Sequence, residues 1–403
     1  MTKANEAVIL SAARTPVGKF QGSLRSVPAT QLGAIAVKAA VERAGINPKE
    51  IEEVIMGNVV QAGEGQAPAR QSGILGGIPA TVSASTVNKV CGSGLKAAMF
   101  ASQAVRAGDA DLFVAGGFES MSRVPYLVNG RSGELKFGNQ PLTDALLHDG
   151  LWDPFENWGM GNAAEFIADE YEVTREAMDQ WALQSHQKAV EAQEKGRFEE
   201  EIVPVPVQGR KGEVTMVERD EGPRKDTSLE ALAKLKPSFK ADGKVTPGNS
   251  SPMNDGGAAV VISSREYAEK NQLKPMAKVI GYAQAAVEPK YLFAAPAYAI
   301  PKLLKKIGWT LKDVDLIELN EAFASQVLAD GYALADQGWD WNKVNVNGGA
   351  LALGHPLGAS GARVLTTLLY ALKDRGLKRG LASLCLGGGE AVAMAVEMAV
   401  ERE

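Results

Sequence analysis

Cys91 is one of only two cysteines in the 403-residue chain, and it lies in segment 87–94, where a helix is expected to begin. Small and apolar residues recur at helical spacing from Leu95 to Val105, and Gly108 is placed as a C-terminal cap. Unpaired N–H groups at a helix start favour a thiolate, so the pattern predicts a pKa for Cys91 below about 8.5 and a nucleophile. The alternative is a cysteine buried as a small apolar residue.

His355 is the second candidate, held between Gly354 and Pro356 in segment 345–361, which contains five glycines. So little side-chain volume indicates a backbone that approaches a ligand or another backbone closely. A histidine fixed in this way just before a helix suits an oriented base. The alternative is a tight structural turn with a hydrogen-bonded histidine.

Two further segments end apolar strands. Cys385 precedes Leu386 and three glycines, so a thiol lies beside free N–H groups such as that of Gly387, as an oxyanion hole requires. Asn320 follows the expected strand 316–319, where its amide could anchor a catalytic water. An ordinary strand end and a turn asparagine would give the same patterns.

Composition excludes several other classes of protein. The net charge of −5 argues against a nucleic-acid-binding surface. Two cysteines cannot form a disulfide framework, and His148, His186 and His355 lack the spacing of a zinc site, so we expect no metal. The first apolar run is too short for a signal peptide and no run reaches about 18 residues, so we expect a cytoplasmic protein without a membrane span. His148 and His186 match no motif and are expected at the surface or in packing.

Two nucleotide-binding patterns also lack support. Segment 92–97 satisfies G-x-G-x-x-[G/A], but no acidic residue follows at the place that a dinucleotide-binding unit requires. The G-x-x-x-x-G-K-[ST] phosphate loop does not occur in the sequence.

The elements that must position these residues alternate between strands and helices, which predicts an α/β fold. We expect strands at 7–10, 51–60, 111–117, 257–262 and 316–319, and helices at 28–44, 91–108 and 174–196. The composition changes near Ser122, where loops and long amphipathic helices begin and continue to about Phe239. This part is expected to be an insertion.

The C-terminal part of the chain repeats the N-terminal part. Segment 44–55 matches 307–318 in pattern, 92–94 matches 359–361, and 114–117 matches 385–388, in the same order. We therefore expect two related halves, with the helices that open at Cys91 and Ala359 buried against each other and a site where loops of both halves meet. The expected segments are an N-terminal half at 1–121, an inserted loop domain at 122–249, the end of the N-terminal half at 250–274 and a C-terminal half at 275–403.

The four motifs together resemble those of the thiolase family, over essentially the whole chain. Segment 90–94 is similar to the nucleophile motif, 320–323 to the NEAF motif, 354–356 to the GHP motif and 385–389 to the C-x-G motif. Segment 248–256 resembles the family's segment beside the pantetheine arm of CoA, in which the position of Ser251 contacts CoA. The resemblance implies duplicated α/β halves in a layered αβαβα arrangement with an inserted loop domain that carries CoA contacts and assembly.

The resemblance also implies an acyltransferase that condenses two acetyl-CoA molecules reversibly into acetoacetyl-CoA and CoA. Cys91, activated by His355, would carry the acyl group, and Cys385 would be the acid and base. Asn320, through a water, and His355 would stabilise the enolate, while the N–H groups of Cys91 and Gly387 would hold the oxygen of the acyl group. Further substrate contacts are expected from the side chains and backbone at Met160, Ser251, Ala322 and Phe323.

Several implications concern partners and specificity. CoA is then a substrate or product, and no cofactor is expected. The alternative within the family is a degradative 3-ketoacyl-CoA thiolase of broader chain length, acting in fatty-acid β-oxidation. A homodimer or homotetramer is expected. Two positions depart from the family pattern. Trp158 stands where a histidine is expected in biosynthetic short-chain members, which leaves the chain-length preference open, and Glu390 stands where many members have an uncharged residue.

Two other readings stay open at this point. A carrier-protein-dependent ketoacyl synthase would share the fold but needs a Cys-His-His set, and only His355 lies in a motif. A non-catalytic acyl-CoA or lipid carrier would keep the fold but is expected to lack at least one reactive residue.

Overall fold

The computed structural model describes residues 6–131, 133, 137–209 and 211–399, and its centre is a ten-stranded sheet. The strands run in the order β14-β15-β16-β13-β1-β12-β5-β3-β4, with β2 paired to β12. Their bounds are β1 (Ala7–Arg14), β2 (Gly18–Lys19), β3 (Glu53–Gly57), β4 (Ser83–Val87), β5 (Leu112–Ser120), β12 (Asn254–Ser264), β13 (Ala277–Ala286), β14 (Leu316–Leu319), β15 (Arg379–Leu386) and β16 (Glu390–Met398).

The sheet consists of two halves with the same strand order and directions. In the N-terminal half, β3 and β5 are parallel, and β5, β12 and β1 then pair antiparallel. In the C-terminal half, β14 and β15 are parallel, and β15, β16 and β13 then pair antiparallel. Within the sheet, the two halves pair through β1 and β13, where Val8 pairs with Lys278 and Ile9 with Ala277. The duplication predicted from the sequence repeat is therefore present in the fold.

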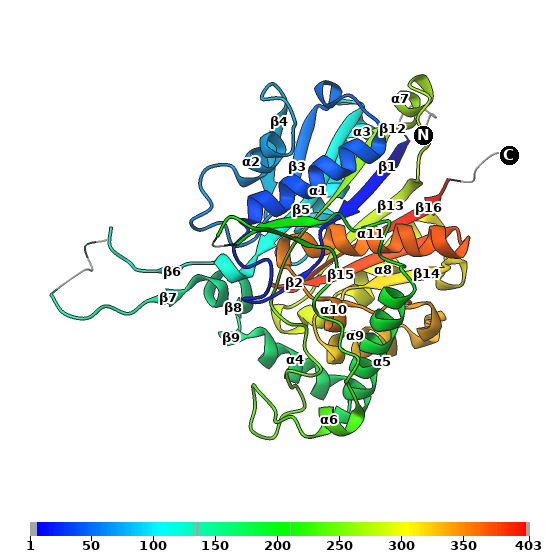
Figure 1. Cartoon of the computed structure of the whole chain (residues 1–403). Helices are drawn as coiled ribbons and strands as arrows, with labels where there is room; N and C mark the ends of the chain where they lie inside the picture. Colours follow the sequence, from blue (N-terminus) through cyan, green and yellow to red (C-terminus); the bar gives the residue numbers. More distant parts are fainter. Residues whose placement is uncertain (1–5, 132, 134–136, 210, 400–403) are drawn as a thin grey trace.

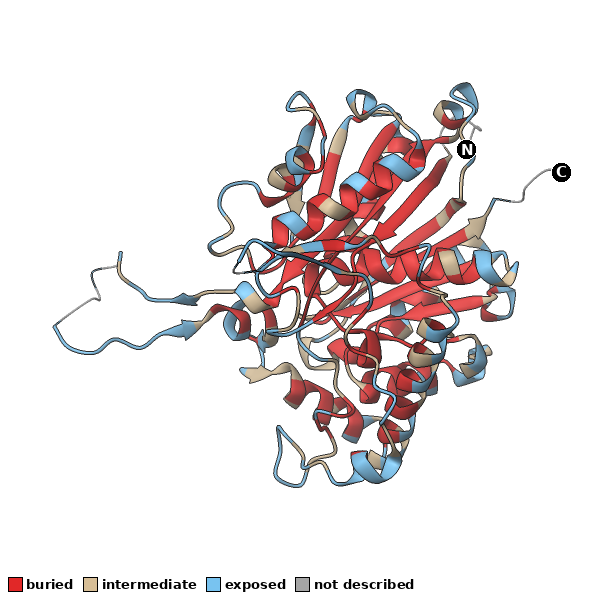
Figure 2. Ribbon diagram, viewed as in Figure 1, coloured by how far each residue is buried: buried red, intermediate tan, exposed pale blue. Residues whose placement is uncertain are grey.

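Helices form three layers around the two half-sheets (Figure 1). Helices α3 (Ser93–Ala107) and α11 (Leu357–Arg375) share one apolar core with strands of both halves. Helices α1 (Ala29–Ala44), α2 (Pro68–Leu75) and α7 (Arg265–Lys270) cover the outer face of the N-terminal half. Helices α8 (Pro296–Ile307) and α9 (Ala324–Ala333) cover that of the C-terminal half. The arrangement is the expected αβαβα layering, and the strands and central helices are its most buried parts (Figure 2).

The two central helices cross at glycines. A Cβ on Gly94 would lie 2.7 Å from the Ala362 nitrogen, and a Cβ on Gly361 would lie 2.3 Å from the Leu95 nitrogen. Only glycine permits this backbone contact. The predicted burial of the two helices against each other is confirmed, but their starts differ, because α3 begins two residues after Cys91 and α11 begins at Leu357, before Ala359.

Local signals set most of the other element boundaries. Gly45 ends α1 with φ +65°, and the Thr174 hydroxyl caps helix α5 (Arg175–Glu194) by accepting from the Ala177 N–H at 3.1 Å. Strands β1, β5 and β12 extend beyond the predicted ranges, and β3 is shorter. Among the described residues, no helix has the length and apolar character needed to cross a membrane.

The segment between β5 and β12 contains short hairpins and helices. They are β6 (Tyr126–Leu127), β7 (Thr143–Asp144), a π-helix (Leu146–Leu151), β8 (Trp152–Asp153), β9 (Trp158–Gly159), α4 (Met160–Glu170), α5, β10 (Val205–Gln208), β11 (Val214–Val217) and α6 (Leu229–Ala233). The β6–β7 hairpin projects from the body (Figure 1). A 3₁₀ helix at Met121–Arg123 opens this segment. Elsewhere lie α10 (Ala350–Leu353) and 3₁₀ helices at Pro48–Glu50, Pro289–Ala294, Leu311–Asp313, Ala335–Gln337 and Trp341–Lys343. The domain boundaries proposed from sequence stay a prediction.

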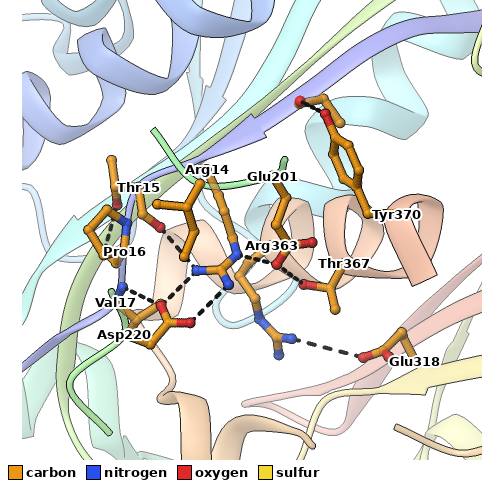
Figure 3. A network of polar contacts seen from close by, with 12 residues as sticks. Arg14, Thr15, Pro16, Val17, Glu201, Asp220, Glu318, Arg363, Thr367 and Tyr370 are labelled. Atoms are coloured by element: carbon orange, nitrogen blue, oxygen red, sulfur yellow. Dashed lines mark hydrogen bonds and ion pairs between the residues drawn. The ribbon is translucent and has the colours of Figure 1, made fainter. Parts of the chain in front are cut away.

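A buried ionic network ties the segment between β5 and β12 to the core (Figure 3). Arg14 of β1 is fully buried and donates to Glu201 at 2.6 Å and to both oxygens of Asp220 at 2.7 and 2.9 Å. The Thr367 hydroxyl of α11 contacts the same Glu201 carboxylate at 3.2 Å. Because a buried charge without its partner is costly, these contacts fix the returning segment against both halves.

Candidate active site

The predicted reactive residues meet in one cavity of about 710 Å³. Its wall combines loops of both halves with the segment between β5 and β12. Eight of the nine candidate residues line it: Cys91, Met160, Ser251, Ala322, Phe323, His355, Cys385 and Gly387. The ninth, Asn320, lies behind His355 and is fully buried.

Cys91 lies in a tight loop between β4 and α3. The Ser93 hydroxyl accepts from the Lys89 N–H at 2.8 Å and donates to the Val90 carbonyl at 2.6 Å. Val90 has φ +46°, which is unfavourable for a β-branched residue and is tolerated because its surroundings hold it. The loop therefore presents Cys91 in one strained and well-supported conformation.

The prediction of a lowered pKa for Cys91 is wrong. Burial raises the pKa of Cys91 to about 11, although the N–H groups of Gly387 and of Cys91 itself lower it. Cys91 precedes the first turn of α3 and packs against two apolar clusters, so the helix dipole does not compensate for the loss of water. The side chain keeps intermediate exposure towards the cavity, and the raised pKa leaves it as a neutral thiol.

His355 is held from both sides. Its N–H donates to the Asn254 side chain at 2.9 Å, and Gly354 has φ +110°, with no room for a Cβ against that same amide. Its ring Nδ1 lies 2.6 Å from the Ser360 Oγ, which in turn lies 2.8 Å from the Pro356 carbonyl. With the serine proton on that carbonyl, Nδ1 carries the ring proton and Nε2 keeps its lone pair.

Burial, reinforced by the charge of Arg363, lowers the pKa of His355 to about 3. The imidazole is therefore neutral at physiological pH. Cys91 is therefore a neutral thiol and His355 a neutral imidazole, rather than a thiolate and an imidazolium. In this state the imidazole can act as a general base that removes the thiol proton when the sulfur attacks.

Asn320 follows β14 directly, and its Nδ2 lies 3.4 and 3.5 Å from the two ring nitrogens of His355. Its Oδ1 is buried and makes no hydrogen bond within the described part of the chain. This places an unused acceptor beside the imidazole.

Cys385 lies near the end of β15, where Gly388 and Gly389, with φ +83° and +88°, turn the chain into β16. It is buried, and burial, together with the nearby Cys91 and Asp330, raises the pKa of Cys385 well above its ordinary value. A neutral thiol of high pKa gives a strong base once it loses its proton.

The cavity also contains residues that the sequence did not single out. His186 is buried, lines the cavity and accepts from the Arg224 N–H at 3.3 Å, and burial with the charge of Arg224 lowers its pKa to about 4. The expectation of a packing role for His186 was incomplete, because no motif marks this position. His148 is exposed, as expected.

The effect of Trp158 on chain-length preference stays a prediction. Gly159 lines the cavity, whereas Trp158 belongs to an apolar cluster, with its ring 5.7 Å from that of Phe166. Met160, which follows Gly159, also lines the cavity. Further apolar residues of the wall lie in short 3₁₀ and π-helices or in loops that no sequence signal marked; among them are Met121, Leu147, Phe239, Met253 and Phe293.

Comparison with known proteins places this geometry in one family. A family model described as the thiolase N-terminal domain matches residues 7–266, and one described as the thiolase C-terminal domain matches residues 273–398. An acetyl-CoA acetyltransferase of Cupriavidus necator is 51% identical over 392 residues, covering 97% of this chain and 99% of that protein. One from Pseudomonas aeruginosa is 50% identical over 389 residues, with 96% and 98% covered. The crystal structure of the Bacillus anthracis acetyl-CoA acetyltransferase superposes with a TM-score of 0.94 at 41% identity, covering 98% of this chain and 99% of that one.

Proposed function

This chain belongs to the thiolase family, and we propose that it is an acetyl-CoA acetyltransferase that condenses two acetyl-CoA molecules reversibly into acetoacetyl-CoA and CoA. The observation that carries the proposal is the convergence of Cys91, His355 and Cys385, from both halves of the chain, on one cavity. The full set of reactive residues argues against a non-catalytic carrier, and the single histidine in a motif argues against a ketoacyl synthase.

The first step is transfer of the acetyl group to Cys91. His355 Nε2 takes the thiol proton as the sulfur attacks the thioester carbon, because neither group is charged beforehand. The N–H groups of Cys91 and Gly387 stabilise the oxyanion, and each such donor is typically worth about 2.7–4 kcal/mol of barrier. The departing CoA thiolate takes its proton from Cys385, which leaves a Cys385 thiolate, a protonated His355 and an acetyl thioester.

The second step forms the carbon–carbon bond. The Cys385 thiolate removes a proton from the methyl group of the second acetyl-CoA, and protonated His355 and a water on Asn320 Oδ1 stabilise the enolate oxygen. The enolate carbon attacks the acetyl thioester, and the Cys91 sulfur leaves and recovers its proton from His355. All protons are then back in place, so this scheme uses CoA only as substrate and product and needs no cofactor.

Substrate contacts are proposed at four positions around the cavity: Met160, Ser251, Ala322 and Phe323. The relatives named acetyl-CoA acetyltransferase favour this activity over a degradative 3-ketoacyl-CoA thiolase of fatty-acid β-oxidation. Relative kcat/KM values for thiolysis of acetoacetyl-CoA and of a longer 3-ketoacyl-CoA separate the two. We expect the higher value with acetoacetyl-CoA, and a clear preference for the longer substrate would favour the degradative enzyme.

Exchange of the acetyl-CoA methyl protons with deuterated water tests the second step. Cys385→Ala should still form the acetyl-enzyme but lose this exchange, because the base is gone. Unchanged exchange in Cys385→Ala would reject the role proposed for this thiol.

Assembly and location are further proposals. The exposed apolar side chains of the projecting hairpin support a homodimer or homotetramer, since Tyr126, Val128 and Leu142 are 63%, 51% and 65% exposed. Two free cysteines that must stay reduced support a cytoplasmic enzyme. Light scattering on the purified protein distinguishes dimer from tetramer.

A further inference from the structure

An ion pair joins the loop that carries Cys91 to the turn that carries Gly387. The Lys89 ammonium donates to Glu390 at 2.6 Å, and the two residues are 301 positions apart in the chain. We propose that the Lys89–Glu390 pair is a latch that positions the N–H groups of Cys91 and Gly387 as one oxyanion hole. This inference rests on the proposed function and names two positioning residues for it.

The loop side of the latch is strained. Val90, with φ +46°, lies between Lys89 and Cys91 in a conformation that β-branched residues rarely adopt. Val90 lies close to the turn, because a Cβ on Gly387 would lie 3.2 Å from Val90 Cγ1. A conformation of this kind persists only where the surroundings hold it, and Lys89 is its immediate neighbour.

The turn side has few side chains that could fix it. Gly387, Gly388 and Gly389 form the turn, and Leu386 pairs with Glu390 where the hairpin closes. The carbonyl of Gly389 accepts from the Val287 N–H at 2.7 Å, which anchors the outer end of the turn. Glu390 is the first residue after the glycines with a side chain, and that side chain reaches back to the Cys91 loop.

Burial and nearby charge strengthen the latch. The side chains of Lys89 and Glu390 are 18% and 36% exposed, so water and salt screen the pair less than a fully exposed one. Lys96 of α3 lies close enough to feel both charges. Burial and the charge of Lys89 lower the pKa of Lys96, and the charge of Glu390 raises it. The Lys96 ammonium lies 3.3 Å from Gln284 Oε1. Loss of the Glu390 charge therefore leaves two ammonium groups close together beside the Cys91 loop.

Neither latch residue is among the described residues that line the cavity, so both act through the backbone rather than on the substrate. Acyl transfer is sensitive to this geometry: a displacement of about 1 Å can cost on the order of a hundredfold in rate. This positioning role explains why a charged residue stands at position 390, where many members of the family have an uncharged one.

The test compares Glu390→Gln and Lys89→Met with the exchanged pair Lys89→Glu/Glu390→Lys. Glu397→Gln is the matched control, because Glu397 lies on the same strand, is 37% exposed and pairs with Arg379 at 3.1 Å, at the far end of β16. We expect kcat for acetoacetyl-CoA thiolysis to fall about ten- to a hundredfold in Glu390→Gln and Lys89→Met, with KM changed less than about twofold. The exchanged pair should recover most of the activity, and Glu397→Gln should match the wild type.

A spectroscopic reading separates positioning from general destabilisation. The carbonyl stretch of the acetyl group on Cys91, read by infrared difference with labelled acetyl-CoA, should shift to higher frequency in Glu390→Gln, because its hydrogen bonds weaken. A wild-type frequency and kcat in both single variants would overturn the latch, as would equal losses in Glu397→Gln. Failure of a correctly folded exchanged pair to recover activity would also overturn it. A wild-type enzyme that forms no acetyl-enzyme would instead reject the proposed function.

Discussion

The pH dependence of Cys91 alkylation follows from the neutral state of the Cys91 and His355 pair. In a Cys385→Ala variant, Cys91 is the only thiol that iodoacetamide can reach, and its reaction rate follows the thiolate fraction. Burial raises the pKa of Cys91 to about 11, so the thiolate fraction near neutral pH is at least roughly a hundredfold lower than for an unperturbed cysteine, whose pKa is about 8.5. His355, with its pKa lowered to about 3, is not protonated and adds no opposing charge.

The expected rate therefore rises about tenfold per pH unit from pH 6 through pH 9 without levelling off. Stopped-flow or quenched alkylation, read by intact mass, measures it, with N-acetylcysteine as the unperturbed reference thiol. A preformed thiolate and imidazolium pair would instead give a rate that is high and constant at or below pH 8. That plateau would refute the neutral pair and the role of His355 as a base that acts during attack.

Two stability predictions test the elements that hold the site. Asp220→Asn should cost about 3–5 kcal/mol of unfolding free energy in urea, because it leaves the Arg14 charge buried and underpaired, whereas Glu200→Gln, in an exposed pair with Lys373, should stay within about 0.5 kcal/mol. An Asp220→Asn variant as stable as the wild type would contradict the anchoring role. Gly361→Ala should cost at least about 1–3 kcal/mol and lower kcat, since its Cβ would lie 2.3 Å from the Leu95 nitrogen. Gly73→Ala, in α2, should be neutral or slightly stabilising, because the nearest atom to its Cβ would be 3.5 Å away. Equal changes in melting temperature in the two variants would contradict the claim that the helix crossing requires glycine.

Much of the architecture could be predicted because local signals and the repeat agree. The matched segments 92–94 and 359–361 correspond to the glycines at which α3 and α11 cross, so a sequence repeat predicted a three-dimensional contact. The reactive residues stand out because Cys91, His355 and Cys385 each lie beside glycines, where the backbone must approach another group closely.

Properties that depend on surrounding layers could not be predicted. The pKa of Cys91 is set by burial under two apolar clusters, which a helix-start pattern does not reveal. Gly159 and Met160 line the cavity and Trp158 does not, and this depends on how the short strand β9 turns into α4. His186 reaches the cavity from α5, whose own pattern shows only an amphipathic helix.

Mapping the acetyl group after incubation with acetyl-CoA tests the central claim most directly. Intact-mass and peptide analysis should show one acetyl group, on Cys91, in the wild type and in Cys385→Ala, and none in Cys91→Ala. An acetyl group that persists in Cys91→Ala, or that maps to Cys385 in the wild type, would contradict the assignment of the nucleophile.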